Sequence, residues 1–291
     1  MIRYGDFSAN LLIIFPKIAG MDVKTTSEME MKKCRLGITL SGGGARGIAH
    51  IGVLESLHRH HLYPEIVSGS SMGALVGVLY AAGLKPGEIL GLVRSSRFFR
   101  LIKWHLPQSG LIDLKVVERI LREKITSDDF GSLKMPFYCA VSNLNSGKVE
   151  FKSEGELIKW VVASASIPII FEPQLINGFT YVDGGLLNNL PVTPIREQCD
   201  FLIGVYVDRN DEITEIKGFK NIAERVFRLG IQQNSVAGMK LCDLLIEPEG
   251  CRDYSTFDFR KAVEIFEAGI DETEKAIREN PGILAFSKPE I

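Results

Sequence analysis

Apolar and polar positions follow one another along the first third of the chain in a way that predicts strands and helices in turn. The apolar run 36–40 is short and bounded by glycines, which is typical of a buried strand. Residues 45–60 then carry apolar side chains at helical spacing. A second strand at Ile66–Val67 precedes a strongly apolar helix at 74–82. This order predicts an α/β fold whose sheet is mostly parallel and covered by helices.

The alternation continues to the C-terminus. Further helices are expected at 85–95, 114–124, 156–165, 222–239 and 259–278, and further strands at 137–141, 148–151, 201–207 and 244–246. No repeat, low-complexity segment or linker interrupts residues 34–291, so we expect a single domain there. Residues 1–33 are expected to be an N-terminal extension, flexible or loosely docked. Its apolar stretch 11–15 is broken by Pro16 and is too short to span a membrane.

Composition and charge narrow the possible functions. A hydrophobic fraction of 45% and a charged fraction of 24% are ordinary for a soluble globular protein. A net charge of −2 gives no electrostatic reason to expect nucleic acid as a partner. The five cysteines are scattered without a CxxC pair, which predicts free thiols in a reducing, cytoplasmic compartment rather than a metal site. Oligomeric state cannot be read from the sequence.

The stretch "GSSMG", residues 69–73, matches the pattern G-x-S-x-G with Ser71 at its centre. It stands between a predicted strand and a predicted helix, where a nucleophile elbow occurs. Such a sharp turn strains the backbone of its central residue, and the small residues Gly69 and Gly73 avoid clashes around it. The hydroxyl of Ser71 would then stand at the positive N-terminus of the following helix. The alternative is a glycine-rich turn with an incidental serine.

The stretch "SGGGARG", residues 41–47, permits two interpretations. Gly42, Gly44 and Gly47 match the dinucleotide fingerprint G-x-G-x-x-G, and Glu65 lies near the position of its ribose-binding acid. Glu65, however, precedes its strand instead of following it. The other interpretation is an oxyanion hole, in which the backbone N–H groups of Gly42, Gly43 and Gly44, joined by that of Met72, surround a developing negative charge.

Arg46 favours the second interpretation. A cation in the first turn of a helix opposes the helix dipole, so it needs a compensating role. A surface salt bridge would be the ordinary alternative.

Histidine is an unsuitable base for Ser71 in this chain, because all five histidines lie within the first 105 residues. The serine–acid–histidine order of α/β-hydrolases is therefore missing. His105 stays as a remote alternative. The better candidate is Asp183 in "YVDGG", where Gly184 and Gly185 permit close approaches that side chains would block. A simple Asp-Gly turn is the competing explanation. A dry pocket would raise the pKa of this carboxyl and make it a better base, with activity that holds to alkaline pH.

These motifs resemble the patatin-like phospholipase family, from Leu36 to about Asp208. Family members carry a G-G-G-x-[RK]-G loop, a G-x-S-x-G elbow and a D-G-[GA] motif, here at 42–47, 69–73 and 183–185. The stretch 163–173 is similar to the segment before the family's aspartate. Ser41 replaces an aspartate found in plant patatins, as it does in bacterial relatives. The whole pattern is most similar to bacterial members related to neuropathy target esterase.

The resemblance implies a three-layer α/β fold with helices on both faces of a mostly parallel central sheet. It also implies a serine hydrolase that cleaves fatty acyl esters of lipids through a Ser71–Asp183 dyad, without metal or cofactor. Two other functions stay open: an NAD(P)-binding oxidoreductase that uses the glycine loop, and a non-catalytic regulatory member of the same fold. Basic and aromatic residues mixed along 97–107 suit a peripheral contact with a membrane surface, or else a loop packed on the core.

Overall fold

The computed structural model describes residues 34–95, 114–209, 216 and 218–289. All of them belong to one compact unit, Lys32–Ile291. Its strands are β1 Cys34–Leu40, β2 Ile66–Gly69, β3 Phe137–Asn143, β4 Lys148–Lys152, β5 Gln174–Ile176, β6 Phe179–Asp183, β7 Cys199–Val205 and β8 Leu244–Ile246. Its helices are α1 Ala49–Arg59, α2 Met72–Ala81, α3 Pro86–Arg94, α5 Lys115–Lys124, α6 Leu157–Ser164, α7 Phe219–Met239 and α8 Ala262–Glu279. The expectations for 1–33 and 97–107 fall outside the described residues.

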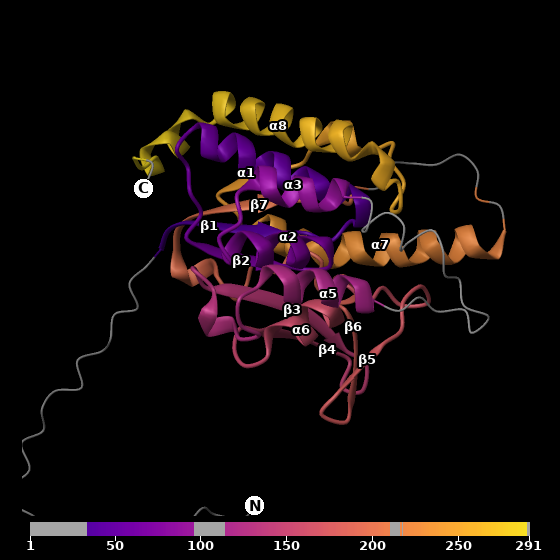
Figure 1. The fold of residues 1–291 in the computed structure, drawn as a ribbon. Helices are drawn as coiled ribbons and strands as arrows, with labels where there is room; N and C mark the ends of the chain where they lie inside the picture. Colours follow the sequence, from indigo (N-terminus) through magenta and orange to yellow (C-terminus); the bar gives the residue numbers. More distant parts are fainter. Residues whose placement is uncertain (1–33, 96–113, 210–215, 217, 290–291) are drawn as a thin grey trace, which may run out of the picture. The chain divides into compact units, whose positions relative to one another are not determined.

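All eight strands form one sheet, in the order β5-β6-β3-β2-β1-β7-β8 with β4 also paired to β3 (Figure 1). The pairs β1–β2, β1–β7, β2–β3 and β7–β8 are parallel, while β4 and β6 run antiparallel to β3. The carboxyl ends of β1, β2, β3, β7 and β8 therefore meet at one edge of the sheet. In open α/β sheets this edge is where ligands bind.

Strand β3 is longer than its neighbour β2, and this difference brings a distant segment into place. β2 ends at Gly69, which pairs with Cys139 of β3. β4 occupies the opposite edge of β3 along its whole paired length. The edge left open beyond Gly69 is taken by β6, whose last residue Asp183 pairs with Val141. Asp183 thus lies just beyond the end of β2, beside the turn that leads into α2.

The two faces of the sheet have separate cores because neighbouring side chains of a strand point in opposite directions. On β1 and β7, Leu36, Ile38 and Ile203 join the large core, which is covered by α1, α2, α3, α5, α6 and α8. Leu202 and Ile66 point the other way, into a smaller core. The segment 190–199 and the C-terminal end of α7 cover this second core. The predicted three-layer fold with a mostly parallel sheet is confirmed.

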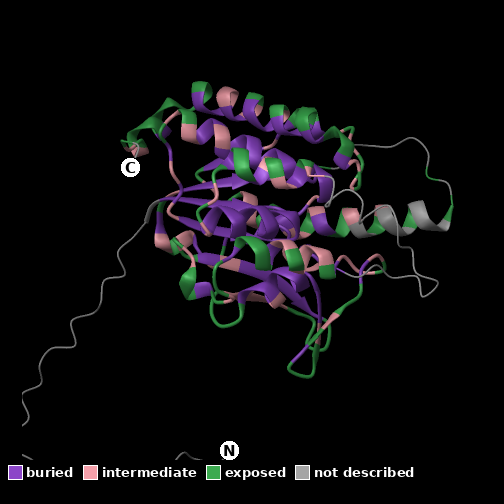
Figure 2. Cartoon of the chain, viewed as in Figure 1, coloured by how far each residue is buried: buried purple, intermediate pink, exposed green. Residues whose placement is uncertain are grey.

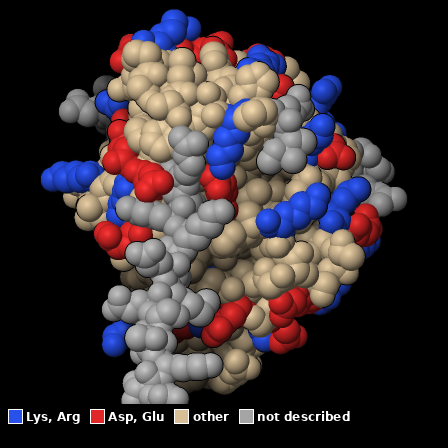
Figure 3. Space-filling model, turned by 90° about the vertical axis from the view of Figure 1, so that its left-hand side faces the viewer, with Lys and Arg blue, Asp and Glu red and all other residues tan. Residues whose placement is uncertain are grey.

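The helices carry their apolar sides inward, as Figure 2 shows for α8, whose outer side is exposed while its inner side is buried against α1. Charged side chains of both signs are interspersed over the face drawn in Figure 3, without a broad field of one sign. None of the described helices combines the length and the apolar character that crossing a membrane requires.

Candidate active site

Ser71 stands in a strained turn between β2 and α2. Its φ of 54° and ψ of −124° lie in a region that residues other than glycine rarely adopt. The turn is possible because of its flanking glycines. A Cβ on Gly69 would lie 2.4 Å from the carbonyl oxygen of Gly73, and one on Gly73 would lie 2.2 Å from that of Leu40. Any side chain at either position would therefore force the backbone apart.

The hydroxyl of Ser71 donates a hydrogen bond of 2.5 Å to Oδ2 of Asp183. The other carboxylate oxygen, Oδ1, accepts the backbone N–H of Gly185 at 2.7 Å. Both side chains are buried. Gly184 allows β6 to approach β3 closely, since a Cβ there would lie 2.2 Å from the carbonyl oxygen of Ala140. The structure thus brings together two residues that are 112 positions apart in the chain.

Burial raises the pKa of Asp183 to about 7, far above the usual value of a carboxyl group. The hydrogen bonds from Ser71 and Gly185 oppose this shift, whereas the nearby Asp208 adds to it. A carboxylate with such a pKa accepts a proton near neutral pH much more readily than an exposed aspartate does.

The glycine loop presents backbone N–H groups to the same place, but not the three that the sequence predicted. The N–H of Gly42 donates to Oδ1 of Asn189 at 3.0 Å, so it is not available to an oxyanion. Gly42 is therefore a correction to the predicted set. Within the described part of the chain, the N–H groups of Gly43, Gly44 and Met72 donate no hydrogen bond. The N–H of Ser71 itself is taken by Oγ of Ser164, at 3.0 Å.

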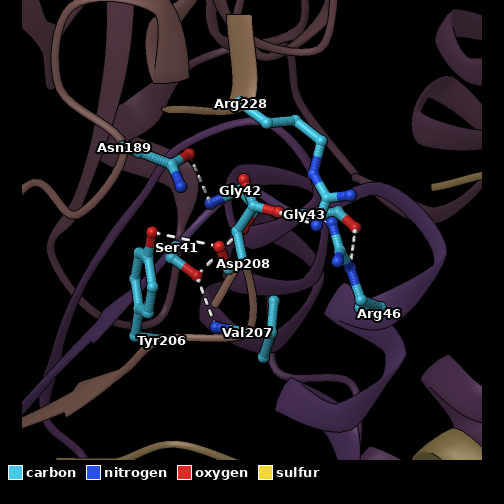
Figure 4. A network of polar contacts seen from close by, with 9 residues as sticks. All are labelled: Ser41, Gly42, Gly43, Arg46, Asn189, Tyr206, Val207, Asp208 and Arg228. Atoms are coloured by element: carbon cyan, nitrogen blue, oxygen red, sulfur yellow. Dashed lines mark hydrogen bonds and ion pairs between the residues drawn. The ribbon is translucent and has the colours of Figure 1, made fainter. Parts of the chain in front are cut away.

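Arg46 connects this loop to Asp208 (Figure 4). Its side chain is buried and forms an ion pair with Oδ1 of Asp208. Its Nε lies 3.5 Å from the carbonyl oxygen of Gly43, to which it donates. Because the C=O and N–H of a trans peptide point in opposite directions, this contact turns the N–H of Gly44 away from Arg46. Nη2 of Arg228 lies 3.6 Å from the same oxygen of Asp208. The sequence left open a surface salt bridge for Arg46, and the structure shows a buried ion pair with Asp208 instead.

Asn189, Asn234, Ser164 and Asp208 belong to the site but were not predicted. Nδ2 of Asn234, on α7, donates to the carbonyl oxygens of Gly185 and Leu186, both at 3.0 Å. Its Oδ1 accepts the N–H of Asn189 at 2.9 Å. Only Asp208 carried a signal in the local sequence, because it directly follows the apolar run 201–207. The asparagines reach the site through contacts between segments far apart in the sequence.

These groups line one pocket at the carboxyl edge of the sheet. Its polar side contains Ser71, Asp183, Asn189 and the glycine loop, and its apolar side contains Ile167, Ile170, Ile231 and Phe257. Gly47 packs against the side chain of Met72 below the loop, and a Cβ there would lie 2.4 Å from Cγ of Met72. In the described ranges no histidine lines this pocket, and no three His, Cys, Asp or Glu side chains are grouped to hold a metal ion.

His50 and Glu65 lie outside this pocket. Nε2 of His50 lies 2.7 Å from the carbonyl oxygen of Ser41, and burial lowers the pKa of this histidine to about 4. Oε1 of Glu65 pairs with Nζ of Lys288 at 2.6 Å. Glu65 precedes β2, so it lies at the opposite edge of the sheet from the glycine loop and cannot contact a ribose bound there. His105 falls outside the described residues.

Several known proteins are similar to this chain. The model of the patatin-like phospholipase family matches residues 38–195. The lysophospholipase NTE1 of Saccharomyces cerevisiae is 28% identical over 271 residues, which cover 81% of this chain and 16% of the yeast protein. NTE1 of Debaryomyces hansenii is 25% identical, over 81% of this chain and 17% of its own length. The chain thus spans less than a fifth of the length of these relatives.

Among solved structures, VipD from Legionella pneumophila is similar with a TM-score of 0.49 at 15% identity, over 85% of this chain and 67% of that one. The family model covers more than half of the chain and includes the glycine loop, the serine elbow and the aspartate motif. The chain therefore belongs to the patatin-like phospholipase family.

Proposed function

We propose that this chain hydrolyses fatty acyl esters of lipids, with Ser71 as nucleophile and Asp183 as general base. The observation that carries the proposal is the 2.5 Å hydrogen bond between their side chains in a buried pocket, next to backbone N–H groups that lack an acceptor among the described residues. Membership of the family supports the reaction class. The names of the yeast relatives add lysophospholipids to phospholipids and simple carboxylic esters as substrates to examine first.

The reaction follows from these positions. Asp183 takes the proton of Ser71 while Oγ attacks the ester carbonyl carbon. The negative charge that develops on the carbonyl oxygen is stabilised by the N–H groups of Gly43, Gly44 and Met72. The tetrahedral intermediate expels the alcohol, which receives the proton from Asp183, and leaves an acyl group on Ser71. Asp183 then deprotonates a water that attacks this acyl group, releasing the fatty acid and restoring the hydroxyl.

We further propose that the pocket opens onto a lipid surface. Exposed apolar residues lie next to lining residues along the chain: Ile169 stands between Ile167 and Ile170, and Val226 is two positions before Arg228. Ile169 is 81% exposed, Val226 on α7 is 65% exposed and Phe257 is 39% exposed. Ile169 also has a φ of 72°, which is costly for a β-branched residue. Apolar groups around the entrance of a lipid site favour contact with a bilayer over contact with water.

The proposal is tested with a fluorophosphonate probe, which reacts with activated serines, followed by peptide mass spectrometry. We expect the label on Ser71 and its loss in Ser71→Ala and Asp183→Asn. Ser70→Ala is the matched control, because Ser70 is the buried neighbour of the nucleophile and does not line the pocket. Release of fatty acid from palmitoyl lysophosphatidylcholine is measured on the same samples. A folded wild-type protein that neither labels nor hydrolyses would instead support the non-catalytic regulatory role.

A further inference from the structure

Asn189 joins the glycine loop to the nucleophile. The residue is 2% exposed and lines the pocket together with Ser71 and Asp183. Its Oδ1 accepts the N–H of Gly42 at 3.0 Å. Because an N–H group can only donate, this contact settles which end of the amide is the oxygen. The orientation of the side chain is therefore fixed by the backbone of the loop, as Figure 4 shows.

The other end of the amide has no acceptor. Nδ2 of Asn189 is buried and makes no hydrogen bond to any described residue. A buried amide nitrogen without an acceptor is unfavourable, so such groups in native proteins call for an explanation. The N–H groups of Gly43 and Gly44 stand in the same pocket, also without an acceptor in the described structure. Donors thus gather beside Ser71, and the partner they lack is an oxygen.

We propose that Nδ2 of Asn189 donates a hydrogen bond to the carbonyl oxygen of the substrate as negative charge develops on it. The inference rests on the proposed function and adds a side-chain donor to the backbone donors of the oxyanion hole. A Cβ on Gly42 would lie 2.4 Å from Oδ1 of Asn189 and 2.9 Å from Cβ of Ser71. The amide and the nucleophile therefore flank the same α carbon, close enough to reach one carbonyl group.

The amide is also held rigidly, as an oxyanion donor must be. The main-chain N–H of Asn189 donates to Asn234 at 2.9 Å, and its main-chain oxygen lies 3.2 Å from the Gly42 nitrogen. A neutral amide serves here better than a cation would. It stabilises the oxyanion without forming an ion pair with Asp183, which must stay free to accept the serine proton.

The first test is Asn189→Asp, which keeps an acceptor for the N–H of Gly42 and removes both amide hydrogens. Asn188→Ala is the matched control, since Asn188 is the neighbouring asparagine and does not line the pocket. At about pH 9, where a carboxyl group is ionised, we expect kcat of Asn189→Asp for a lipid oxoester to fall about 100-fold or more. KM should stay close to that of the wild type. The melting temperature should fall at this pH because the variant buries an ionised carboxylate, so the assay is run well below it. An unchanged kcat would overturn the inference.

The second test does not depend on how much of a variant is folded. Sulfur accepts hydrogen bonds weakly, so a thionoester gains less from an oxyanion donor than the matching oxoester does. We expect the ratio of kcat/KM for oxoester over thionoester to fall about tenfold in Asn189→Ala and Asn189→Asp. A ratio equal to that of the wild type would show that Asn189 only supports the loop. An inactive wild type would remove the proposed function as well, whereas an active wild type with unaffected variants overturns this inference alone.

Discussion

The carboxyl group of Asp183 links the burial of the site to its chemistry. Burial raises its pKa to about 7, and only the ionised form can take the proton of Ser71. We therefore expect kcat/KM to rise tenfold per pH unit below about pH 7 and to level off above it, without a decline up to moderately alkaline pH. A pH–rate profile with a water-soluble ester measures this. A rate that is still rising steeply at about pH 9 would contradict a base of this pKa.

The raised pKa of Asp183 also makes the stability of the folded chain depend on pH. The folded chain holds a proton on Asp183 more tightly than the unfolded chain does, so between the usual pKa and about 7 the folded state binds more protons. The free energy of unfolding therefore decreases as pH rises through this window. Asp183→Asn has no charge to bury, so its melting temperature relative to the wild type should increase from acid to alkaline pH. A difference in melting temperature that stays constant from acid to alkaline pH would contradict the burial of a charge at Asp183.

The residues of the site differed in how far they could be predicted. The sequence pointed to Ser71 and Asp183 because each is surrounded by small residues that the local backbone needs. Asn189 and Asp208 were not predicted, because their partners Gly42 and Arg46 are 147 and 162 positions away in the chain. Gly42 was assigned the wrong partner for the same reason. The run of glycines predicts that several backbone N–H groups of the loop point to one place. Only the packing of segment 187–190 shows which of these N–H groups already has a hydrogen-bond acceptor.

At the scale of elements, the turn between β2 and α2 depends on close contact between backbones. A Cβ on Gly73 would lie 2.2 Å from the carbonyl oxygen of Leu40, which belongs to a buried strand and cannot move aside. We expect Gly73→Ala to lower the free energy of unfolding by about 3 kcal/mol and to abolish hydrolysis. Gly91→Ala is the control, because Gly91 lies on the exposed side of α3 with open space around it. Chemical denaturation should show this control to be stabilised by about 1 kcal/mol.

The strands that contain a clear apolar run were predicted best. The runs that became β1, β7 and β8 are mostly apolar, so their positions were predicted to within about two residues. The hairpin of β5 and β6 was missed as a pair of strands. Leu175 and Phe179 on it are exposed, so burial does not impose an alternating pattern. Its pairing with β3, which places Asp183, is a contact between distant segments that no local pattern encodes.

At the scale of the whole molecule, the exposed apolar residues near the pocket should matter for substrates in a bilayer and not for soluble ones. We expect the double variant Ile169→Asn with Val226→Ser to bind several-fold less to vesicles of phosphatidylcholine and phosphatidylglycerol, because less apolar surface can enter the interface. Asparagine is chosen at 169 because it tolerates a positive φ. Hydrolysis of a short soluble ester should stay unchanged, since neither side chain lines the pocket.

Leu284→Ser provides the comparison for this surface. Leu284 is 41% exposed and precedes the C-terminus, which Figure 1 places at the far end of α8 from the exposed part of α7. Its loss removes an apolar group as large as those at the pocket entrance, but from another part of the surface. Vesicle sedimentation of the three proteins therefore separates a directed contact from general hydrophobic adhesion. Equal losses in both variants, or no loss in the double variant, would contradict a membrane contact at the pocket entrance. A loss confined to the double variant would mean that the entrance faces the bilayer from which the substrate is drawn.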